Sequence, residues 1–201
     1  MIVVIDYGLG NIMSVSRALE KAGAAVQISS KPGDIEEADA LVLPGVGAFR
    51  KAMNNINDLG FKEVLLQYLL SDRPYLGICL GMQILFDESY EHGRTKGFGI
   101  IEGTVEKFPT DVKIPHMGWN QVSFSESGAM SGTITENSYF YFDHSYYASV
   151  VNSDNIAART DYGMNFVSAV RKGNIWGVQF HPEKSSSTGL RLLKNFIEYA
   201  G

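Results

Sequence analysis

The sequence has little that would support a disulfide framework, a multi-cysteine metal site or a membrane span. It contains one cysteine in 201 residues, which excludes an internal disulfide and any site built from several thiolates. No apolar run approaches the ~18–20 residues that cross a bilayer. No basic segment precedes the apolar residues 2–5, so we expect no signal peptide. We therefore expect a cytoplasmic protein.

Positive charge is also scarce. Lys and Arg number 17 against 22 Asp and Glu, which gives a net charge of −5. Such a field repels phosphate backbones and anionic lipid, so we predict no nucleic-acid or membrane partner. No Gly-Lys dipeptide occurs, which excludes a P-loop, and the histidines lack HxxxH spacing. We predict neither a metal nor a cofactor.

A glycine-rich turn, Gly8-Leu9-Gly10, follows the first apolar run and invites a dinucleotide-binding interpretation. That fingerprint needs a third small residue, and Met13 occupies its position. We therefore interpret the segment as a tight turn between a strand and a helix.

Short apolar runs alternate with helical patterns in the first half of the chain. Strands are predicted at 2–5, 25–29, 40–43 and 75–79, and helices at 12–22, 48–56, 61–70 and from about 81. This alternation indicates βαβ units and a mainly parallel sheet. From 97 to 179 the chain is β-rich and partly antiparallel, and an amphipathic helix follows at 188–199. We predict one α/β domain over 1–201, with a mainly parallel central sheet flanked by helices.

The most informative segment runs from Tyr75 to Gln83. It has the form strand, Gly-x-Cys-x-Gly, helix, which is a nucleophile elbow with Cys79 in place of serine. The N-terminus of the following helix favours a thiolate over a thiol. The N–H of Leu80, directly after the cysteine, could donate to an oxyanion. A lone cysteine is usually a small buried hydrophobe, but this sequence context favours a nucleophile.

A thiolate nucleophile needs a base and a group that orients the base. His181-Pro182-Glu183 follows an apolar strand, and in extended geometry His181 and Glu183 point the same way. We interpret them as the base and its carboxylate, although alone they could be a strand-end histidine and a solvated glutamate. The loop 44–47 follows the third strand, so an N–H of Val46 or Gly47 could complete an oxyanion hole, or the loop could be a simple connection.

These segments together resemble the class I (triad) glutamine amidotransferases. The shared motifs are Gly77-Ile78-Cys79-Leu80-Gly81-Met82-Gln83 and His181-Pro182-Glu183. Other segments resemble the glutaminase subunits of imidazole glycerol phosphate synthases: 6–11, 44–49, 115–120 and 179–185. The resemblance runs from residue 2 to the final helix. One departure is Asp143, where we expect an apolar residue, usually Val, and its effect should fall on local packing.

The resemblance implies a reaction and a substrate site. Cys79 attacks the side-chain amide of L-glutamine and forms a glutamyl thioester, while His181 moves the protons and Glu183 orients His181. Gln83 and the backbone around Ser145 and Tyr146 hold the glutamine. The loop with Val46 reorients a backbone N–H toward the oxyanion.

The resemblance also implies a partner. Ammonia passes through a channel into a (β/α)8-barrel cyclase subunit of the heterodimer. There it converts the phosphoribulosylformimino intermediate (PRFAR) to imidazole glycerol phosphate and aminoimidazole carboxamide ribotide in histidine biosynthesis. The residues expected at the interface are Asn11, Met117, Trp119, Tyr141 and Lys184. For Trp119 and Tyr141 the alternative is that they are core aromatics.

Three other functions stay open at this stage. A stand-alone cysteine hydrolase of γ-glutamyl or peptide bonds uses the same elbow but needs no partner. A different amidotransferase would share the triad but should lack the segment Pro115 to Asn120. An inactive binding subunit would keep only the fold, and the intact triad argues against it.

Overall fold

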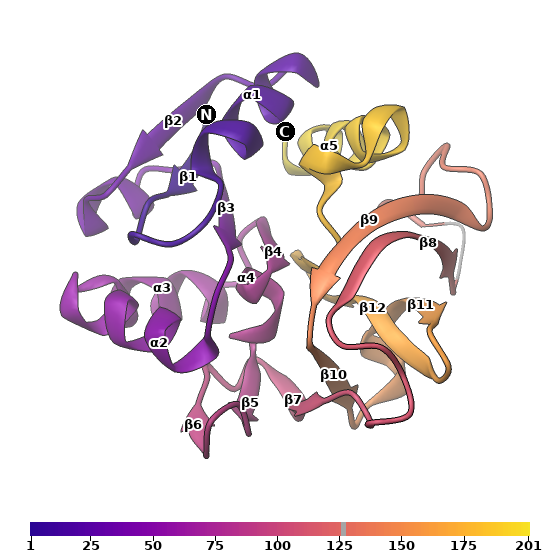
Figure 1. The fold of residues 1–201 in the computed structure, drawn as a ribbon. Helices are drawn as coiled ribbons and strands as arrows, with labels where there is room; N and C mark the ends of the chain where they lie inside the picture. The colour runs from indigo at the N-terminus through magenta and orange to yellow at the C-terminus, as the bar shows by residue number, and fades with distance from the viewer. Residues whose placement is uncertain (126–127) are drawn as a thin grey trace.

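Five parallel strands form the centre of the protein (Figure 1). The computed structural model describes residues 1–125 and 128–201. The strands follow the order β2 (Val26–Ser29), β1 (Ile2–Ile5), β3 (Ala40–Gly45), β4 (Tyr75–Cys79) and β13 (Ile175–Val178), each parallel to its neighbour. Every residue of β1, β3, β4 and β13 is buried, as expected for strands covered on both faces, whereas the edge strand β2 is partly exposed.

Helices cover the two faces of this parallel sheet. The helices α1 (Ile12–Lys21) and α5 (Ser186–Ala200) lie on one face, and α2 (Phe49–Asp58) and α3 (Phe61–Leu70) on the other (Figure 1). Alternate residues of β1 enter the two resulting cores, because successive strand side chains point to opposite faces. Val3 packs in the core under α2 and α3, and Val4 in the core under α1 and α5.

The sheet becomes largely antiparallel beyond β13. It continues through β12 (Asn165–Lys172), β10 (Tyr146–Val150) and β7 (Ile101–Lys107) to β5 (Phe86–Ser89) and β6 (Thr95–Lys96). A branch from β12 runs through β11 (Ile156–Asp161) to β8 (His116–Phe124) and β9 (Ser138–His144). This branch brings β9 beside the segment that follows β13, where His181 donates its backbone N–H to the carbonyl of Tyr141.

The expected fold class is therefore confirmed, including the β-rich second half, of which residues 126–127 lie outside the described residues. The helix expected near Gly81 is a single turn, α4 (Leu80–Gln83). Short 3-10 helices occur at η1 (Pro32–Ile35), η2 (Ser153–Asn155) and η3 (Pro182–Lys184). In the described part of the chain, no helix has the length and apolarity to span a membrane.

Candidate active site

Cys79 ends β4 in a strained backbone conformation. Its φ is +53° and its ψ is −106°, a backbone conformation that residues other than glycine rarely adopt. Such a conformation costs about 1–3 kcal/mol, which the surrounding packing must supply. The sharp turn expected for a nucleophile elbow is confirmed.

The glycines that flank Cys79 permit close packing and do not themselves adopt the strained conformation. Neither Gly77 nor Gly81 has a positive φ, and the strained residue is the cysteine itself. A Cβ on Gly77 would lie 2.3 Å from the carbonyl oxygen of Gly81, and a Cβ on Gly81 would lie 1.8 Å from that of Leu43. The glycines are needed because the turn packs against itself and against β3.

The N–H groups that follow the cysteine belong to a very short helix. Leu80 is the first residue of α4, so its N–H has no partner within the helix. A one-turn helix has few aligned peptide dipoles, so it contributes less through its macrodipole than a longer helix would. Stabilisation of a developing negative charge by α4 therefore comes mainly from hydrogen bonds donated by its individual N–H groups.

His181 and Glu183 form a buried ion pair beside the cysteine. Nδ1 of His181 lies 2.9 Å from Oε1 of Glu183, and their side chains are 3% and 1% exposed. Nε2 of His181 is buried and has no hydrogen-bond partner among the described residues. The imidazole is therefore oriented at one nitrogen and free at the other, as a proton-transferring base requires.

The charge environment of His181 favours the imidazolium. Burial alone would lower the pKa of His181, but interactions with Cys79 and Glu183 outweigh burial and raise the pKa to about 10. The structure thus brings together the three residues that the sequence analysis expected to act as one unit.

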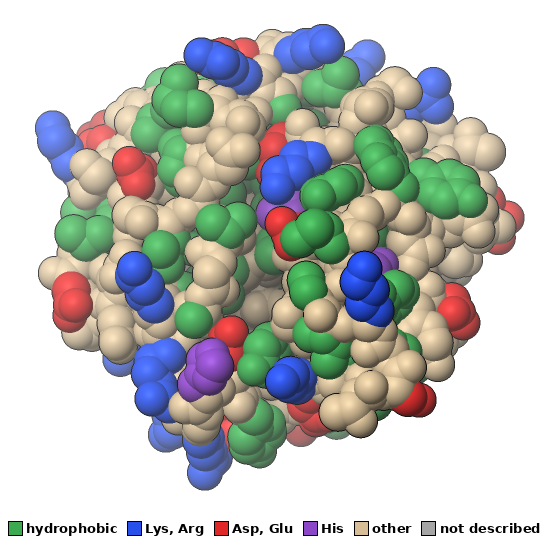
Figure 2. Space-filling view, in the orientation of Figure 1, with side chains coloured by type: hydrophobic (Ala, Val, Ile, Leu, Met, Phe, Trp, Pro, Cys, Tyr) green, Lys and Arg blue, Asp and Glu red, His purple; other side chains and the backbone are tan. Residues whose placement is uncertain are grey.

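An open cavity of about 590 Å³ lies over Cys79 at the carboxyl end of the parallel strands. Figure 2 shows this face of the molecule, hollowed near its middle. The residues expected to bind substrate or oxyanion all line the cavity: Val46, Gly47, Leu80, Gln83, Ser145 and Tyr146. Val46 and Gly47 form the loop after β3, where Gly47 has a φ of +103°.

The amide of Gln83 is held by two acceptors. Its Nε2 donates to the carbonyl of Tyr146 at 3.2 Å and to Oε1 of Gln179 at 2.9 Å. Nε2 of Gln179 in turn donates to Sγ of Cys79 at 3.5 Å. Gln179 begins the segment 179–185 that carries part of the family resemblance, but no role was expected for it.

Two acidic residues outside the expected triad line the cavity. Glu91 lines it and accepts a hydrogen bond from the N–H of Phe49 at 2.6 Å. Asp143 also lines it, opposite Met117 in the β8–β9 pair. The unexpected carboxylate of Asp143 therefore lies at the cavity, not within the apolar packing of the sheet. Glu91 was missed because no recognised motif surrounds it.

Three of the residues expected at a subunit interface, Met117, Trp119 and Tyr141, lie on the outer face of β8 and β9. Met117 and Trp119 are 60% and 52% exposed, so Trp119 is not a core aromatic. Trp119 meets the half-buried Tyr141 edge to face, and Nζ of Lys184 lies 5.4 Å from the ring centre of Tyr141. Asn11 is exposed in the loop after β1. Hydrophobic side chains gather beside the hollow in Figure 2.

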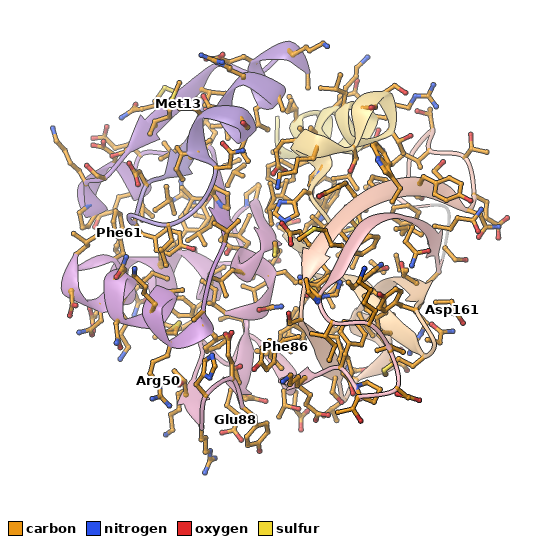
Figure 3. The ribbon with its side chains drawn as sticks, in the orientation of Figure 1. Met13, Arg50, Phe61, Phe86, Glu88 and Asp161 are labelled. Carbon is orange, nitrogen blue, oxygen red and sulfur yellow. The ribbon has the colours of Figure 1, made fainter. Side chains whose placement is uncertain are left out.

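Side chains farther from the cavity are shown in Figure 3, where Arg50 and Glu88 lie at the edge near β6 and Asp161 lies at the end of β11. Within residues 1–125 and 128–201, no three His, Cys, Asp or Glu side chains lie close enough to hold a metal ion.

Comparisons with known proteins agree with this geometry. Residues 3–199 match the class I glutamine amidotransferase family. A solved structure described as a glutamine amidotransferase superposes with a TM-score of 0.79 at 20% identity, covering 99% of this chain and 98% of that one, which shows the fold. A chain in the structure of PurLQS from Thermotoga maritima superposes with a TM-score of 0.77 at 17% identity, covering 100% and 98%.

Full-length relatives are more similar in sequence. Imidazole glycerol phosphate synthase subunit HisH of Syntrophotalea carbinolica is 46% identical, with 98% of each chain covered. The subunit of the same name from Aquifex aeolicus is 47% identical, covering 96% of this chain and 94% of the relative. This chain therefore belongs to the class I glutamine amidotransferases and, within them, to the HisH subunits of imidazole glycerol phosphate synthase.

Proposed function

We propose that this chain hydrolyses L-glutamine to glutamate and ammonia and delivers the ammonia to a cyclase subunit. The observation that carries the proposal is the buried His181–Glu183 pair, which interacts with Cys79 on its strained elbow and leaves Nε2 of His181 unpaired among the described residues. The nucleophile, the base and the orienting carboxylate are all present and buried at one end of the sheet.

The first half of the reaction is acyl transfer to the cysteine. The thiolate of Cys79 attacks the side-chain amide carbon, and the carbonyl oxygen becomes an oxyanion. The N–H of Leu80 and an N–H from Val46 or Gly47 stabilise that charge. His181, holding the thiol proton, gives it to the leaving nitrogen, so that ammonia departs and a glutamyl thioester remains.

The second half is hydrolysis of the thioester. His181 takes a proton from water, and the resulting hydroxide attacks the thioester carbon. Cys79 leaves as the thiolate and glutamate is released, so the enzyme returns to its starting state. Glu183 holds the imidazole in place throughout.

The cavity suits the rest of the glutamine molecule. Both N–H groups of the Gln83 amide are already used, so its Oε1 is the group that can accept from the substrate. The carboxylate of Glu91 at the cavity wall suits the α-ammonium group. Ser145 and Tyr146 supply backbone groups along the same wall.

The partner in this proposal is a (β/α)8-barrel cyclase. Its ammonia-dependent step converts PRFAR to imidazole glycerol phosphate and aminoimidazole carboxamide ribotide. Ammonia that escapes into water becomes protonated and loses its nucleophilicity, so a docked acceptor is needed over the cavity. Met117 and Trp119 give that interface an apolar centre, flanked by Tyr141 and Lys184, and the exposed Asn11 is a further candidate contact.

The test is glutamate release by the purified chain, alone and then with a cyclase subunit and its ligand. We expect slow release by the chain alone and a large increase when both are added. Equal rates in the two conditions would contradict activation by the cyclase. They would favour a stand-alone amide or γ-glutamyl hydrolase, which should also accept larger amides. No release in either condition would contradict the proposed function.

A further inference from the structure

Two buried histidines lie next to the cavity and have no role in the chemistry proposed above. His116 of β8 and His144 of β9 are paired directly across the two strands, and they are 3% and 6% exposed. Nδ1 of His116 lies 2.9 Å from Nε2 of His144. Aromatic rings enclose both imidazoles, with Phe142 and Tyr162 stacked on His116.

The partners of the two rings fix where their protons lie. Nδ1 of His144 is 2.7 Å from the carbonyl oxygen of Tyr146, and because a carbonyl only accepts, that nitrogen carries a proton. In the neutral ring Nε2 then accepts from Nδ1 of His116. Nε2 of His116 accepts in turn from the amide of Asn120 at 3.2 Å.

Burial keeps both rings neutral, as this arrangement requires. Burial lowers the pKa of His116 to about 4, and it lowers that of His144 to about 3. The second N–H of the Asn120 amide donates to the carbonyl of Asp161 at 2.8 Å. The hydrogen bonds therefore run in one direction, from Asn120 through His116 and His144 to Tyr146.

The chain of hydrogen bonds ends on an atom that belongs to the substrate cavity. The carbonyl oxygen of Tyr146 accepts from His144 and also from Nε2 of Gln83. Gln83 is linked through Gln179 to the sulfur of Cys79. A displacement of this carbonyl would rotate the Gln83 amide, whose orientation decides whether Oε1 or Nε2 faces the substrate.

We infer that His116 and His144 are positioning residues for glutamine binding: as neutral, Nδ1-protonated imidazoles they hold the Tyr146 carbonyl where it orients the Gln83 amide. They act on the substrate through Tyr146 and Gln83 and not by contact with it. This inference rests on the proposed glutaminase function.

The test compares two replacements of His144 in the complex with the cyclase and its ligand. His144→Phe keeps a ring but removes the donor to Tyr146, so we expect KM for glutamine to rise about tenfold with kcat within about threefold. His144→Asn places an N–H near the position of Nδ1, so it should restore KM to within about threefold of wild type.

A matched control perturbs the same ring cluster without touching the hydrogen bonds. Phe166 is buried against both histidines, and Phe166→Leu should lower Tm while leaving KM unchanged. The rate at which iodoacetamide alkylates Cys79 should stay the same in all variants, since that reagent does not use the Gln83 amide. A KM in His144→Phe equal to wild type, or a KM that follows Tm across all three variants, would overturn the inference.

A second measurement does not depend on turnover. Long-range proton–nitrogen spectra of the chain should show both imidazoles protonated at Nδ1 between pH 6 and 8, and a proton on Nε2 of His144 would overturn the inference. If the wild-type complex releases no glutamate at all, the proposed function fails and the inference fails with it. Normal wild-type kinetics with an unaffected His144→Phe variant overturn the inference alone.

Discussion

His181 is fixed to Tyr141 through its backbone: the N–H of His181 donates to the carbonyl of Tyr141 at 2.8 Å. Ser185 closes a ring around this bond, because it accepts from the N–H of Tyr141 at 3.0 Å and donates to the carbonyl of His181 at 2.6 Å. The proposed base is therefore held by the strand whose outer face carries the exposed aromatic surface. A shift of β9 would move the base.

Ser185→Ala should weaken the attachment of the base. The variant leaves the partly buried N–H of Tyr141 without its partner, which costs about 1 kcal/mol of the free energy of unfolding. We expect kcat for glutamine hydrolysis in the complex to fall about tenfold with little change in KM, measured by steady-state kinetics. Ser138→Ala is the control, because that hydroxyl lies on the same strand and bonds only locally to Thr135. Equal kcat values in the two variants would contradict a positioning role for Ser185.

Cys79→Ala should separate glutamine hydrolysis by this chain from ammonia-dependent synthesis by the cyclase. The variant removes the nucleophile, so glutamine-dependent synthesis by the complex should fall below detection. Synthesis from added ammonium salt should continue at the wild-type rate, because the cyclase does not need the cysteine. Both rates are measured by product formation in the reconstituted complex. Residual glutamine-dependent synthesis would contradict the assignment of Cys79 as nucleophile.

Gly45→Ala should destabilise the end of β3 next to the elbow. A Cβ on Gly45 would lie 2.2 Å from the hydroxyl of Tyr7 and 2.9 Å from Cβ of Leu80. We expect a loss of about 1–3 kcal/mol in urea-induced unfolding. Adding Tyr7→Phe should recover part of it, because that buried hydroxyl has no hydrogen-bond partner among the described residues. Gly33→Ala, with no atom within 4 Å of its added Cβ, is the control and should be nearly neutral.

Acid should destabilise the protein through its two neutral buried histidines. Below pH 6.5 an unfolded histidine binds a proton, whereas the folded pKa values are about 4 for His116 and about 3 for His144. Their stabilising contribution is complete above pH 6.5 and is lost as pH falls toward these values. For His144 the loss is about 1.4 kcal/mol per pH unit. His181 adds no slope below pH 6.5, because its pKa, raised to about 10, keeps it protonated when folded as it is when unfolded.

Urea unfolding at pH 7, 6 and 5 measures this slope. Between pH 6 and 5, His144→Phe should take up about one proton fewer on unfolding than wild type. The slope of its unfolding free energy against pH should be smaller by about 1.4 kcal/mol per pH unit. Identical slopes in the two proteins would show that His144 is already charged when folded.

Met117→Glu should weaken docking of the cyclase. The side chain is 60% exposed on the proposed interface, so a charge there costs binding while the fold is unaffected. We expect affinity, measured by calorimetry, to fall at least tenfold. Leu70→Glu is the control, because Leu70 is 64% exposed at the end of α3 and the loop after it leads to the start of β4, away from the cavity. Equal affinities would place the interface elsewhere.

The sequence alone determined the parallel half of the fold and the elbow. Buried β-branched strands, helix periodicity and glycine spacing are local patterns, so 61–70 and 75–79 were predicted with the observed bounds. The pairing of His181 with Glu183 was also expected, but from extended geometry, whereas Pro182–Lys184 form the 3-10 helix η3. The expected partners are therefore confirmed, and the expected local conformation is wrong.

Tertiary structure decided what depends on pairing between distant strands. Gln179 meets Cys79 across 100 residues, and His116 faces His144 only because β8 and β9 pair in that register. No local pattern carries such information, because a shift of one residue in the register would turn these side chains to the opposite face of the sheet. The proposed nucleophile could be found in the sequence, but the hydrogen bonds that orient its surroundings exist only in the folded chain.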